Sequence, residues 1–399
     1  MLTEARAAHG NGASVVATRV IIAGALAAHP LGASGNTWAF LQYVLGFRRL
    51  GFDTYYVEHI ANDNCINDAC RPVAFADSAN ARHFRDAMAR YSLTDHAALL
   101  HWDGVEHVGL SHTDVERLAR ETALFVNISG RFHLASILGA ARRRLYLDLD
   151  PGFAQIWQQQ YGVDMNLRGH DLYVTVGLNL GAAGCPLPTC GLEWHTTLPP
   201  VVLSEWTTTQ AAGPAYSTVA DWRGYNPVEW RGVWYGQKSE EFLRVLDLPR
   251  RVDVPLELCL AIHPDEPDRA CLLEYGWRLV DPRTHVSTLD SYRNYVFGSR
   301  GELTAVKNGY AAGRSGWFSD RSACYLAAGR PVIIQDTGLA GHLPTGEGLL
   351  VFTDVASAAS AIDRVEADYA RHAAAAAEFA RRYLDSDRVI GRLVELSEL

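Results

Sequence analysis

The sequence predicts an α/β protein that consists of two doubly wound domains. Its 399 residues are too many for one compact core and suit two ordinary domains. Hydrophobic residues make up 48% of the chain and charged residues 20%, which is typical of a globular protein and excludes a disordered or collagen-like chain. Strand-like and helix-like segments alternate in both halves, which favours parallel sheets. Such domains bind ligands beyond the carboxyl ends of their strands, and two of them facing each other form a cleft.

The first half opens with a β–α–β unit. Residues 19–24 (RVIIAG) form a short apolar run rich in β-branched residues. Residues 36–50 have apolar side chains at helical spacing, with Asn36 as the N-cap and Gly51 after the last turn. Residues 53–60 (DTYYVEHI) are again strand-like. Further strands are expected at 123–129, 143–150 and 171–178, and helices around 132–141 and 153–162.

The boundary between the domains is expected near residues 200–210. A Gly/Cys/Pro-rich stretch at 181–191 interrupts the alternation, and the two prolines within 196–206 indicate a crossing between domains. The alternation then restarts and the chain ends in helices. In this half we expect strands at 215–222, 256–263, 277–281, 331–335 and 348–354, and helices at 237–248, 268–276, 289–297 and 319–328.

The net charge indicates which partners the protein does not bind, and the cysteine content indicates its cellular compartment. Lys and Arg total 36 against 45 Asp and Glu, a formal charge of −9, so a global basic surface for nucleic acid or an anionic membrane is not expected. No stretch reaches the length of a membrane span, and the apolar run at 20–28 leaves a signal peptide as an alternative. Seven cysteines favour a reducing, cytoplasmic compartment. The pairs Cys65/Cys70 and Cys185/Cys190 leave a metal or redox site as an alternative.

The strongest local motif lies at residues 313–338 (GRSGWFSDRSACYLAAGRPVIIQDTG). Ser319 stands directly before a helical run and follows a loop that contains Gly316. Such a loop offers backbone amides, the positive end of a helix dipole and a hydroxyl, which together suit a phosphate group. Asp320 and Arg321 in the first turn suit ribose hydroxyls and phosphate, respectively. The alternative is an ordinary capped helix, in which the dipole alone favours Asp320.

This motif resembles the donor-binding helix of GT-B glycosyltransferases. Family members that modify small natural products carry an H-C-G-W-N-S type motif, and Gly316, Trp317 and Ser319 match it. A Gly-x-Pro follows the helix here as in the family, at residues 329–331. Arg314 takes the place of the family's histidine. More closely, S-G-W-F-S-D-R-S and G-R-P-V-x-x-Q-D-T-G resemble motifs of actinobacterial-type glycosyltransferases.

The resemblance implies a GT-B fold, with two Rossmann-like domains facing each other across a cleft. Residues 1–205 would bind the acceptor, residues 206–380 would bind a nucleotide-diphosphate sugar (UDP or dTDP), and residues 381–399 would form a helix that returns to the first domain. The implied activity is sugar transfer to a small-molecule acceptor in natural-product biosynthesis, with the nucleotide sugar as co-substrate and with neither a metal nor another cofactor. A homodimer is left open.

Carried over by position, the resemblance also implies roles for individual residues. The amides of Ser315 and Gly316, together with Ser319, would contact the diphosphate, and Asp320 would contact the ribose. Basic residues neutralise the departing diphosphate in this fold, where charge accumulates in the transition state. The residues implied for the donor sugar are Gln335, Asp336 and Thr337, and those implied for the departing diphosphate are Arg223, Lys238 and, less directly, Lys307. The alternatives are a polar turn at a strand end for 335–337 and a solvated helix residue for Lys238.

The general base is expected in the first domain. Transfer with inversion needs a group that takes the proton of the acceptor nucleophile. The small-molecule branch of the family carries a second histidine, just before the first helix. Counted back from Gly51, that place is held by Asn36, which cannot act as a base. His29, in the loop after the first strand, and Asp150, at a predicted strand end, are the preferred catalytic candidates. Asp148, His170 and His195 are further candidates. Asp148 and Asp150 also form a D-x-D, which leaves a metal site as an alternative.

Two other functions remain open from the sequence. One is a GT-B-shaped epimerase or hydrolase that acts on the nucleotide sugar, and the other is a non-catalytic nucleotide-sugar-binding protein, which the missing family histidine favours. A dinucleotide oxidoreductase is disfavoured, because the loop after the first strand lacks a compact G-x-G-x-x-G. Six aromatic residues near the predicted junction are expected mainly to pack a hinge, with one or two touching a ligand: Trp194, Trp206, Trp222, Tyr225, Trp230 and Trp234.

Overall fold

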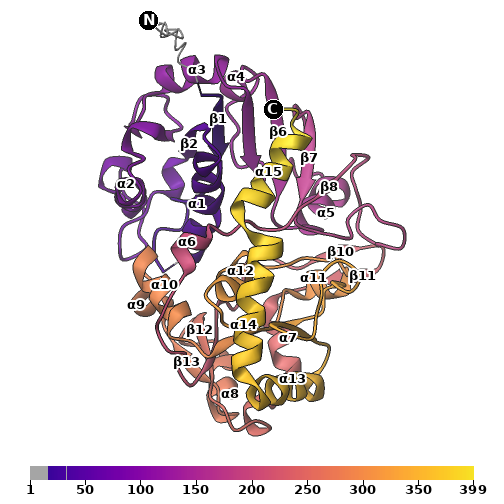
Figure 1. The fold of residues 1–399 in the computed structure, drawn as a ribbon. Helices are drawn as coiled ribbons and strands as arrows, with labels where there is room; N and C mark the ends of the chain where they lie inside the picture. The colour runs from indigo at the N-terminus through magenta and orange to yellow at the C-terminus, as the bar shows by residue number, and fades with distance from the viewer. Residues whose placement is uncertain (1–16, 33) are drawn as a thin grey trace, which may run out of the picture.

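A computed structural model describes residues 17–32 and 34–399, which form two lobes, each built around its own sheet (Figure 1). The first sheet has eight strands in the order β4-β3-β2-β1-β5-β6-β7-β8. All neighbouring strands are parallel except β3 and β4. The strands are β1 (Arg19–Ala23), β2 (Asp53–Ile60), β3 (Ala97–His101), β4 (His107–Gly109), β5 (Leu124–Ile128), β6 (Arg143–Asp148), β7 (Leu172–Thr175) and β8 (His195–Thr196).

The second sheet has six strands, all parallel, in the order β13-β12-β9-β14-β15-β16. The predicted two-domain α/β fold is therefore confirmed. The strands are β9 (Tyr216–Asp221), β12 (Leu256–Ala261), β13 (Arg278–Val280), β14 (Gly301–Thr304), β15 (Val332–Gln335) and β16 (Leu349–Phe352). A separate antiparallel hairpin joins β10 (Val228–Trp230) to β11 (Val233–Tyr235).

Helices connect the strands and cover the sheets. Those of the first lobe are α1 (Ser34–Arg49), α2 (Ala79–Arg90), α3 (His112–Arg120), α4 (Ala135–Leu138) and α5 (Phe153–Gln160). The short α6 (Leu203–Trp206) lies between the two sheets in the chain, where the boundary is expected. Those of the second lobe are α7 (Lys238–Arg244), α8 (Pro267–Glu274), α9 (Pro282–His285), α10 (Leu289–Phe297), α11 (Asn308–Ala312), α12 (Asp320–Ala327), α13 (Val355–Ala367) and α14 (Tyr369–Phe379).

The last helix, α15 (Ser386–Leu396), returns to the first lobe, as the resemblance implies (Figure 1, yellow). It follows α14 after a π-helical turn over residues 380–384. A Cβ added to Gly46 of α1 would lie 2.8 Å from Ile390, so the two helices are in close contact. Arg49 of α1 also forms an ion pair of 2.8 Å with Asp387. This segment therefore joins the two lobes.

Of the six aromatic residues expected at the junction, Trp206 packs between the lobes, whereas Trp194 and Trp222 pack within their own lobes. Trp206 is fully buried and lies 5.0 Å from Trp38 of α1, centroid to centroid, and 6.2 Å from Tyr292 of α10. The indole of Trp38 donates to the carbonyl of Leu289, also in α10. Apolar contacts of this kind are non-directional and stabilise the pairing of the lobes through buried area. Trp234, in contrast, is 55% exposed and takes no part in this cluster.

Some elements differ from their predicted bounds. Helix α1 begins two residues before Asn36, so Asn36 lies in the first turn, where its side chain donates to the carbonyl of Ala25 at 3.1 Å. The helix expected at 132–141 is a single turn, α4. Strand β14 was not predicted, because it has only four residues and one of them, Glu302, is charged. Glu302 is fully buried, and its ion pair with Arg321 makes this burial tolerable. In the described part of the chain, no helix has the length and apolar content needed to cross a membrane.

Candidate functional site between the two lobes

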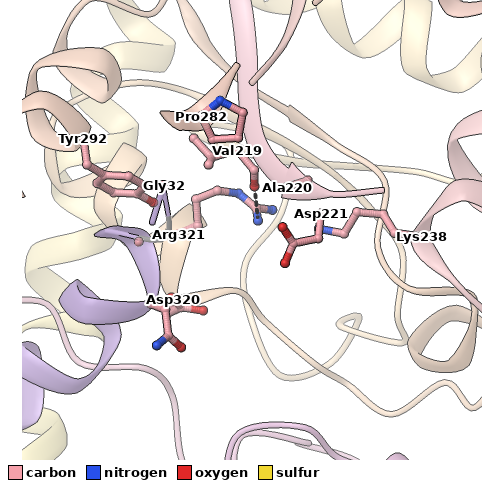
Figure 2. Close-up of a pocket in the computed structure, with 11 residues that line it drawn as sticks. Gly32, Val219, Ala220, Asp221, Lys238, Pro282, Tyr292, Asp320 and Arg321 are labelled. Atoms are coloured by element: carbon pink, nitrogen blue, oxygen red, sulfur yellow. Dashed lines mark hydrogen bonds between the residues drawn. The ribbon is translucent and has the colours of Figure 1, made fainter. Parts of the chain in front are cut away.

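A cavity of about 200 Å³ opens between the lobes at the carboxyl end of the second sheet (Figure 2). The loop after β1 and the start of α1 form one wall. The end of β9 and the first residues of α7 and α12 form the other, as the doubly wound fold dictates. The lining residues are Gly32, Gly35, Asn36, Val219, Ala220, Asp221, Lys238, Pro282, Tyr292, Asp320 and Arg321. We refer to this space as the interlobe cavity.

Lys238 supplies a positive charge to the interlobe cavity. Its side chain points into the same space as Asp221 and Arg321 (Figure 2). Among the described residues, no carboxylate lies within ion-pair distance of its ammonium group. Burial, together with the positive charges of Arg321 and Lys307, lowers the pKa of Lys238 to about 7. An anion placed here would raise this pKa again, so the site favours a negatively charged ligand.

Arg321 also lines the cavity, but its guanidinium is occupied by the protein. Its Nε forms an ion pair with the fully buried carboxylate of Glu302 on β14. Its Nη1 donates to the carbonyl of Val219 at 3.0 Å, as Figure 2 shows, and its Nη2 donates to the hydroxyl of Thr304 at 2.9 Å. Arg321 therefore ties the end of β9 to β14 and fixes the shape of this wall.

The start of α12 presents Asp320 to the cavity. Ser319 caps the helix, because its hydroxyl accepts from the amide of Arg321 at 3.2 Å. Ser319 is 1% exposed, so its hydroxyl serves the helix in this structure. Asp320 is the first residue of the helix and lines the interlobe cavity. Burial raises the pKa of the Asp320 carboxyl, while the positive charge of Arg321 acts in the opposite direction.

The loop before α12 does not have the free amides that the sequence predicts. The amide of Ser315 donates to the carbonyl of Tyr310 at 3.2 Å, and that of Gly316 donates to Thr337 at 2.8 Å. The loop packs on the first lobe, where Asn179 donates to the carbonyl of Ser315 at 3.1 Å. Gly316 has a φ of +70°, and a Cβ there would lie 2.9 Å from the amide nitrogen of Asn179. This loop is thus a contact between the lobes, and the prediction that its amides are available to a diphosphate was wrong.

The polar turn after β15 braces that loop. Thr337 is fully buried and donates to the carbonyl of Trp317 at 2.7 Å. Gln335 is buried against Glu241 of α7, and Asp336 accepts from the amide of Gly338 at 2.9 Å. None of the residues 335–337 lines the interlobe cavity. The hydrogen bonds support the alternative of a polar turn at a strand end.

Arg223 and Lys307, the two other predicted cations, are already paired. Arg223 is half exposed and forms ion pairs with Glu266 at 3.1 Å and Asp268 at 2.8 Å, outside the cavity lining. Lys307 forms an ion pair of 3.1 Å with Asp150. Of the three basic candidates, the structure brings only Lys238 to the cavity.

Asp150 holds the two lobes together rather than facing the interlobe cavity. Its carboxylate, from the first lobe, accepts from the ammonium of Lys307 and from the hydroxyls of Tyr225 and Tyr310, all in the second lobe. The neighbouring Asp148 is fully buried, and burial raises its pKa to about 6. It accepts from Thr175 at 2.8 Å, so both carboxylates of the D-x-D are engaged within the protein.

Of the two preferred catalytic candidates, His29 is the one that remains accessible. It is exposed on the loop after β1, directly before Pro30, Leu31 and Gly32, which line a second cavity. Loss of surrounding water lowers the pKa of His29, while the charge of Asp221 on the opposite lobe acts to raise it. The net effect lowers the pKa of His29 below its usual value, which favours the neutral imidazole that a base requires. His170, in contrast, is buried and lies 3.2 Å from the side-chain amide of Asn127.

A buried carboxyl group supports the loop that carries His29. The sequence did not indicate this role. Glu58 of β2 accepts from the amide of Ala27 at 2.9 Å and from the hydroxyl of Tyr56 at 3.0 Å. Tyr56 in turn accepts from the amide of Leu26 at 2.9 Å. Burial raises the pKa of Glu58 to about 8. The loop after β1 is thus held at two points, Leu26 and Ala27, shortly before His29.

The second cavity adjoins the interlobe cavity at Gly32 and measures about 290 Å³. Helix α2 of the first lobe forms most of its charged wall. The lining residues are Pro30, Leu31, Gly32, Asp68, Ala79, Arg82, His83, Asp86, Arg283 and Ser287. The sequence did not reveal this cavity, because no element was assigned to residues 61–122. We refer to it as the α2 cavity.

The cysteine pairs form no recognisable centre. All seven cysteines are free, with Cys65 buried and Cys70 exposed. Within the described residues, the one triad of potential metal ligands comprises His101, Asp103 and Glu106, and includes no cysteine.

Comparisons with known proteins identify the fold. No protein-family model and no curated protein matches this chain by sequence. The structure of Anabaena Alr3699/HepE in complex with UDP and glucose is similar, with a TM-score of 0.57 and 12% identity over 96% of this chain and 100% of that chain. AviGT4, a glycosyltransferase involved in avilamycin A biosynthesis, is similar with a TM-score of 0.55 and 12% identity over 96% and 97%. A glycosyltransferase from Rickettsia africae ESF-5 has a TM-score of 0.51 and 9% identity over 96% and 98%. The chain has the two-domain fold of GT-B glycosyltransferases.

Proposed function

We propose that this protein is a glycosyltransferase that moves a sugar from a nucleotide-diphosphate donor, UDP or dTDP based, to a small-molecule acceptor. The observation that carries the proposal is Lys238, whose ammonium faces the interlobe cavity and has no carboxylate partner among the described residues. The diphosphate of a nucleotide sugar would supply the missing negative charge. A structure of the similar HepE holds UDP and glucose, which agrees with this assignment.

Each group around the interlobe cavity has a role in this proposal. Lys238 neutralises the diphosphate as negative charge accumulates on it in the transition state. Asp320, at the start of α12, accepts hydrogen bonds from ribose hydroxyls, as its position in the motif implies. Ser319 and Arg321 act indirectly, because the first caps α12 and the second fixes the ends of β9 and β14.

The acceptor is assigned to the α2 cavity. It meets the interlobe cavity at Gly32, so an acceptor hydroxyl placed there lies beside the donor sugar. Together the two cavities reach the size of ordinary small-molecule sites, about 300–1,000 Å³. The oxygen of the acceptor hydroxyl attacks the anomeric carbon of the donor sugar, and the nucleoside diphosphate leaves. His29, on the same loop, takes the proton of that hydroxyl. The similar AviGT4 acts in avilamycin A biosynthesis, which favours a natural product as acceptor.

A nucleotide panel tests the donor assignment. We expect UDP or dTDP, at millimolar concentration, to raise the melting temperature of the protein, because a ligand that binds only the folded state stabilises it by mass action. UMP and dTMP, which lack the second phosphate, are the matched controls and should give a smaller shift. Equal shifts with monophosphates and diphosphates, or no shift with any nucleotide, would contradict a diphosphate site at Lys238.

The variant His29→Ala separates binding from turnover. Loss of a general base typically slows a reaction by about 10²–10⁴-fold. We therefore expect release of nucleoside diphosphate in the presence of an acceptor to fall by that factor, while the Kd for UDP or dTDP stays within about twofold of that of the unmodified protein. A turnover rate unaffected by the substitution would remove His29 from the mechanism.

A non-catalytic nucleotide-sugar-binding protein is the second candidate. Asn36 occupies the place of the family's second histidine and lines the interlobe cavity, where its amide is held by Ala25. Asp150 is held by Lys307 and two tyrosines, so it is not free to act as a base. This candidate predicts nucleotide binding without turnover across a broad acceptor panel.

A further inference from the structure

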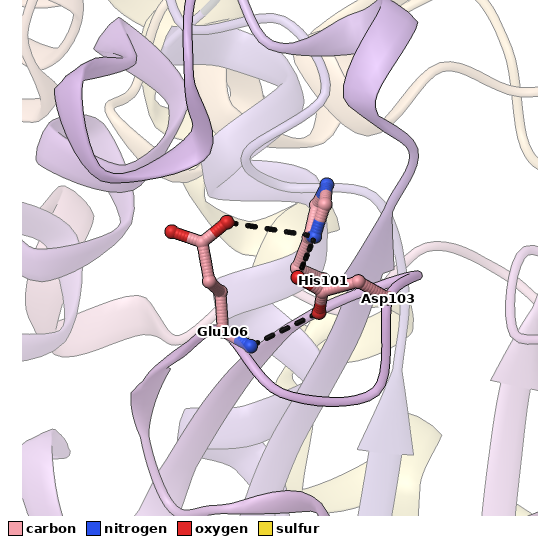
Figure 3. Close-up of side chains that lie close together, drawn as sticks. All are labelled: His101, Asp103 and Glu106. Carbon is pink, nitrogen blue, oxygen red and sulfur yellow. Dashed lines mark hydrogen bonds and ion pairs between the residues drawn. The ribbon is translucent and has the colours of Figure 1, made fainter.

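The hairpin between β3 and β4 gathers three side chains that are ligands for metal ions (Figure 3). Strand β3 ends at His101, and the turn that follows carries Asp103 and Glu106. One oxygen of Asp103 accepts from the amides of Val105 at 2.8 Å and Glu106 at 3.0 Å. These bonds fix the turn and direct the other oxygen of Asp103 toward His101.

His101 is buried in this cluster without a hydrogen-bond partner. The residue is 7% exposed, and within the described chain neither ring nitrogen makes a hydrogen bond. Its Nδ1 lies 3.0 Å from Oδ2 of Asp103 and 3.8 Å from Oε2 of Glu106. Both contacts are within ion-pair distance and are drawn dashed in Figure 3, but neither has hydrogen-bond geometry. Buried polar groups are normally paired, so a partner between the three side chains would account for this arrangement.

The distances fit ligands that surround one ion. With metal–ligand bonds of about 2.0–2.2 Å, neighbouring ligand atoms of a tetrahedral or octahedral ion lie about 2.9–3.6 Å apart. The 3.0 Å from Nδ1 to Asp103 lies within that range, the 3.8 Å to Glu106 lies slightly above it, and all three ligand atoms lie within 4.8 Å of one another. Imidazole nitrogen combined with carboxylate oxygen suits Zn²⁺ and similar transition-metal ions better than Ca²⁺ or Mg²⁺. We propose that His101, Asp103 and Glu106 bind one divalent transition-metal ion such as Zn²⁺, with water completing the coordination.

The proposed ion would stabilise the edge of the first sheet. Strand β4 has three residues and is the last strand on that side, so few ladder hydrogen bonds hold it. An ion shared by the end of β3 and the turn would tie the hairpin closed. None of the three ligands lines the interlobe cavity or the α2 cavity, so the site is structural and independent of the proposed sugar transfer.

Calorimetric titration of Zn²⁺ into the full-length, untagged, chelator-treated protein tests the site. We expect one saturable site with a micromolar or tighter Kd. His101→Ala should weaken binding at least about 100-fold, and Glu106→Gln, which leaves the turn bonds of Asp103 in place, about tenfold. His107→Ala is the matched control, because His107 is exposed on the same hairpin with Nδ1 near the carbonyl of Val105, and it should bind as the unmodified protein does.

Two outcomes would overturn the proposal. The first is the absence of saturable binding by the unmodified protein. The second is binding that survives both His101→Ala and Glu106→Gln, which would place Zn²⁺ elsewhere, for example on the free cysteines.

The absorption spectrum of bound Co²⁺ distinguishes these ligands. Thiolates produce a near-ultraviolet charge-transfer band, whereas a site of one imidazole and two carboxylates does not. That band should therefore be missing. If His101→Ala fails to fold, the test relies on Glu106→Gln alone, provided that its melting temperature is unchanged.

Discussion

Replacing Lys238 by alanine is expected to weaken the binding of UDP or dTDP about 100-fold. Lys238 is the cation that faces the interlobe cavity without a carboxylate partner among the described residues, whereas Arg321, Arg223 and Lys307 are all paired. Truncating one partner of a buried, hydrogen-bonded charge pair typically costs about 2–5 kcal/mol, and about 2.8 kcal/mol corresponds to a factor of 100 in Kd. Isothermal titration of both proteins with the nucleotide measures the change.

Arg223→Ala is the matched control for that experiment. Arg223 was the other main cation predicted from the sequence to meet the diphosphate, yet it pairs with Glu266 and Asp268 at the surface. Its removal should change the Kd less than about threefold, since exposed ion pairs contribute little. If Arg223→Ala weakened binding as much as Lys238→Ala, the donor would occupy a place other than the interlobe cavity.

The pH dependence of binding provides an independent measure of the same charge. The pKa of Lys238 in the free protein is lowered to about 7, and a bound diphosphate would raise it. Binding is therefore strongest when Lys238 is protonated and weakens as the pH rises above 7, by up to about tenfold per pH unit. We expect the Kd for UDP or dTDP to rise between pH 7.5 and 8.5, and this rise should be absent in Lys238→Ala.

The second large effect is expected from Arg321→Ala, on stability. Removing the guanidinium leaves the carboxylate of Glu302 fully buried without its ionic partner, and also removes the bonds to Val219 and Thr304. Breaking a buried ion pair from one side typically costs about 3–5 kcal/mol. Urea denaturation, followed by circular dichroism, should show a loss of that size in the free energy of unfolding.

A double variant tests whether the buried charge is the cause. In Arg321→Met/Glu302→Leu, neither charge is present and the volume is largely kept. Replacing a buried ion pair by apolar side chains is often neutral, so most of the lost stability should return. A double variant as unstable as Arg321→Ala would assign the effect to the bonds with Val219 and Thr304. A loss below about 1 kcal/mol in Arg321→Ala would mean that water reaches Glu302.

The pattern of apolar residues predicted most of the strands and their order in the chain. The run at 53–60 matches β2, and the run at 215–222 contains β9 with one residue to spare at each end. Parallel strands that are buried on both faces need continuous apolar runs, which mark most of these strands, although the buried run that forms β3 was not assigned to a strand. Strand β14 escaped prediction, since its buried polar residue is tolerated only because Arg321, 19 residues later in the chain, pairs with it.

The candidate site was predictable only in part. Lys238 and Asp320 begin helices at strand ends, and such positions face the cleft in any doubly wound domain. The residues of the α2 cavity, such as Arg82 and His83, carry no distinguishing local pattern. The loop at 313–318 was misjudged, because its sequence shows glycines and a helix start but cannot show that Asn179 and Thr337 occupy its backbone groups.

By itself, the sequence determined the fold class, the two-domain organisation and the presence of a capped helix at Ser319, since these depend on local periodicity and on short-range hydrogen bonds. Only the tertiary structure decided which charged groups remain free. Arg223 looks as suitable as Lys238 in the sequence, and Lys307 is a less direct candidate of the same kind, but partners far along the chain engage both of them. The same holds for the carboxylate of Asp150. The availability of a charge depends on what lies within about 4 Å of it, and chain contacts between distant segments set that distance.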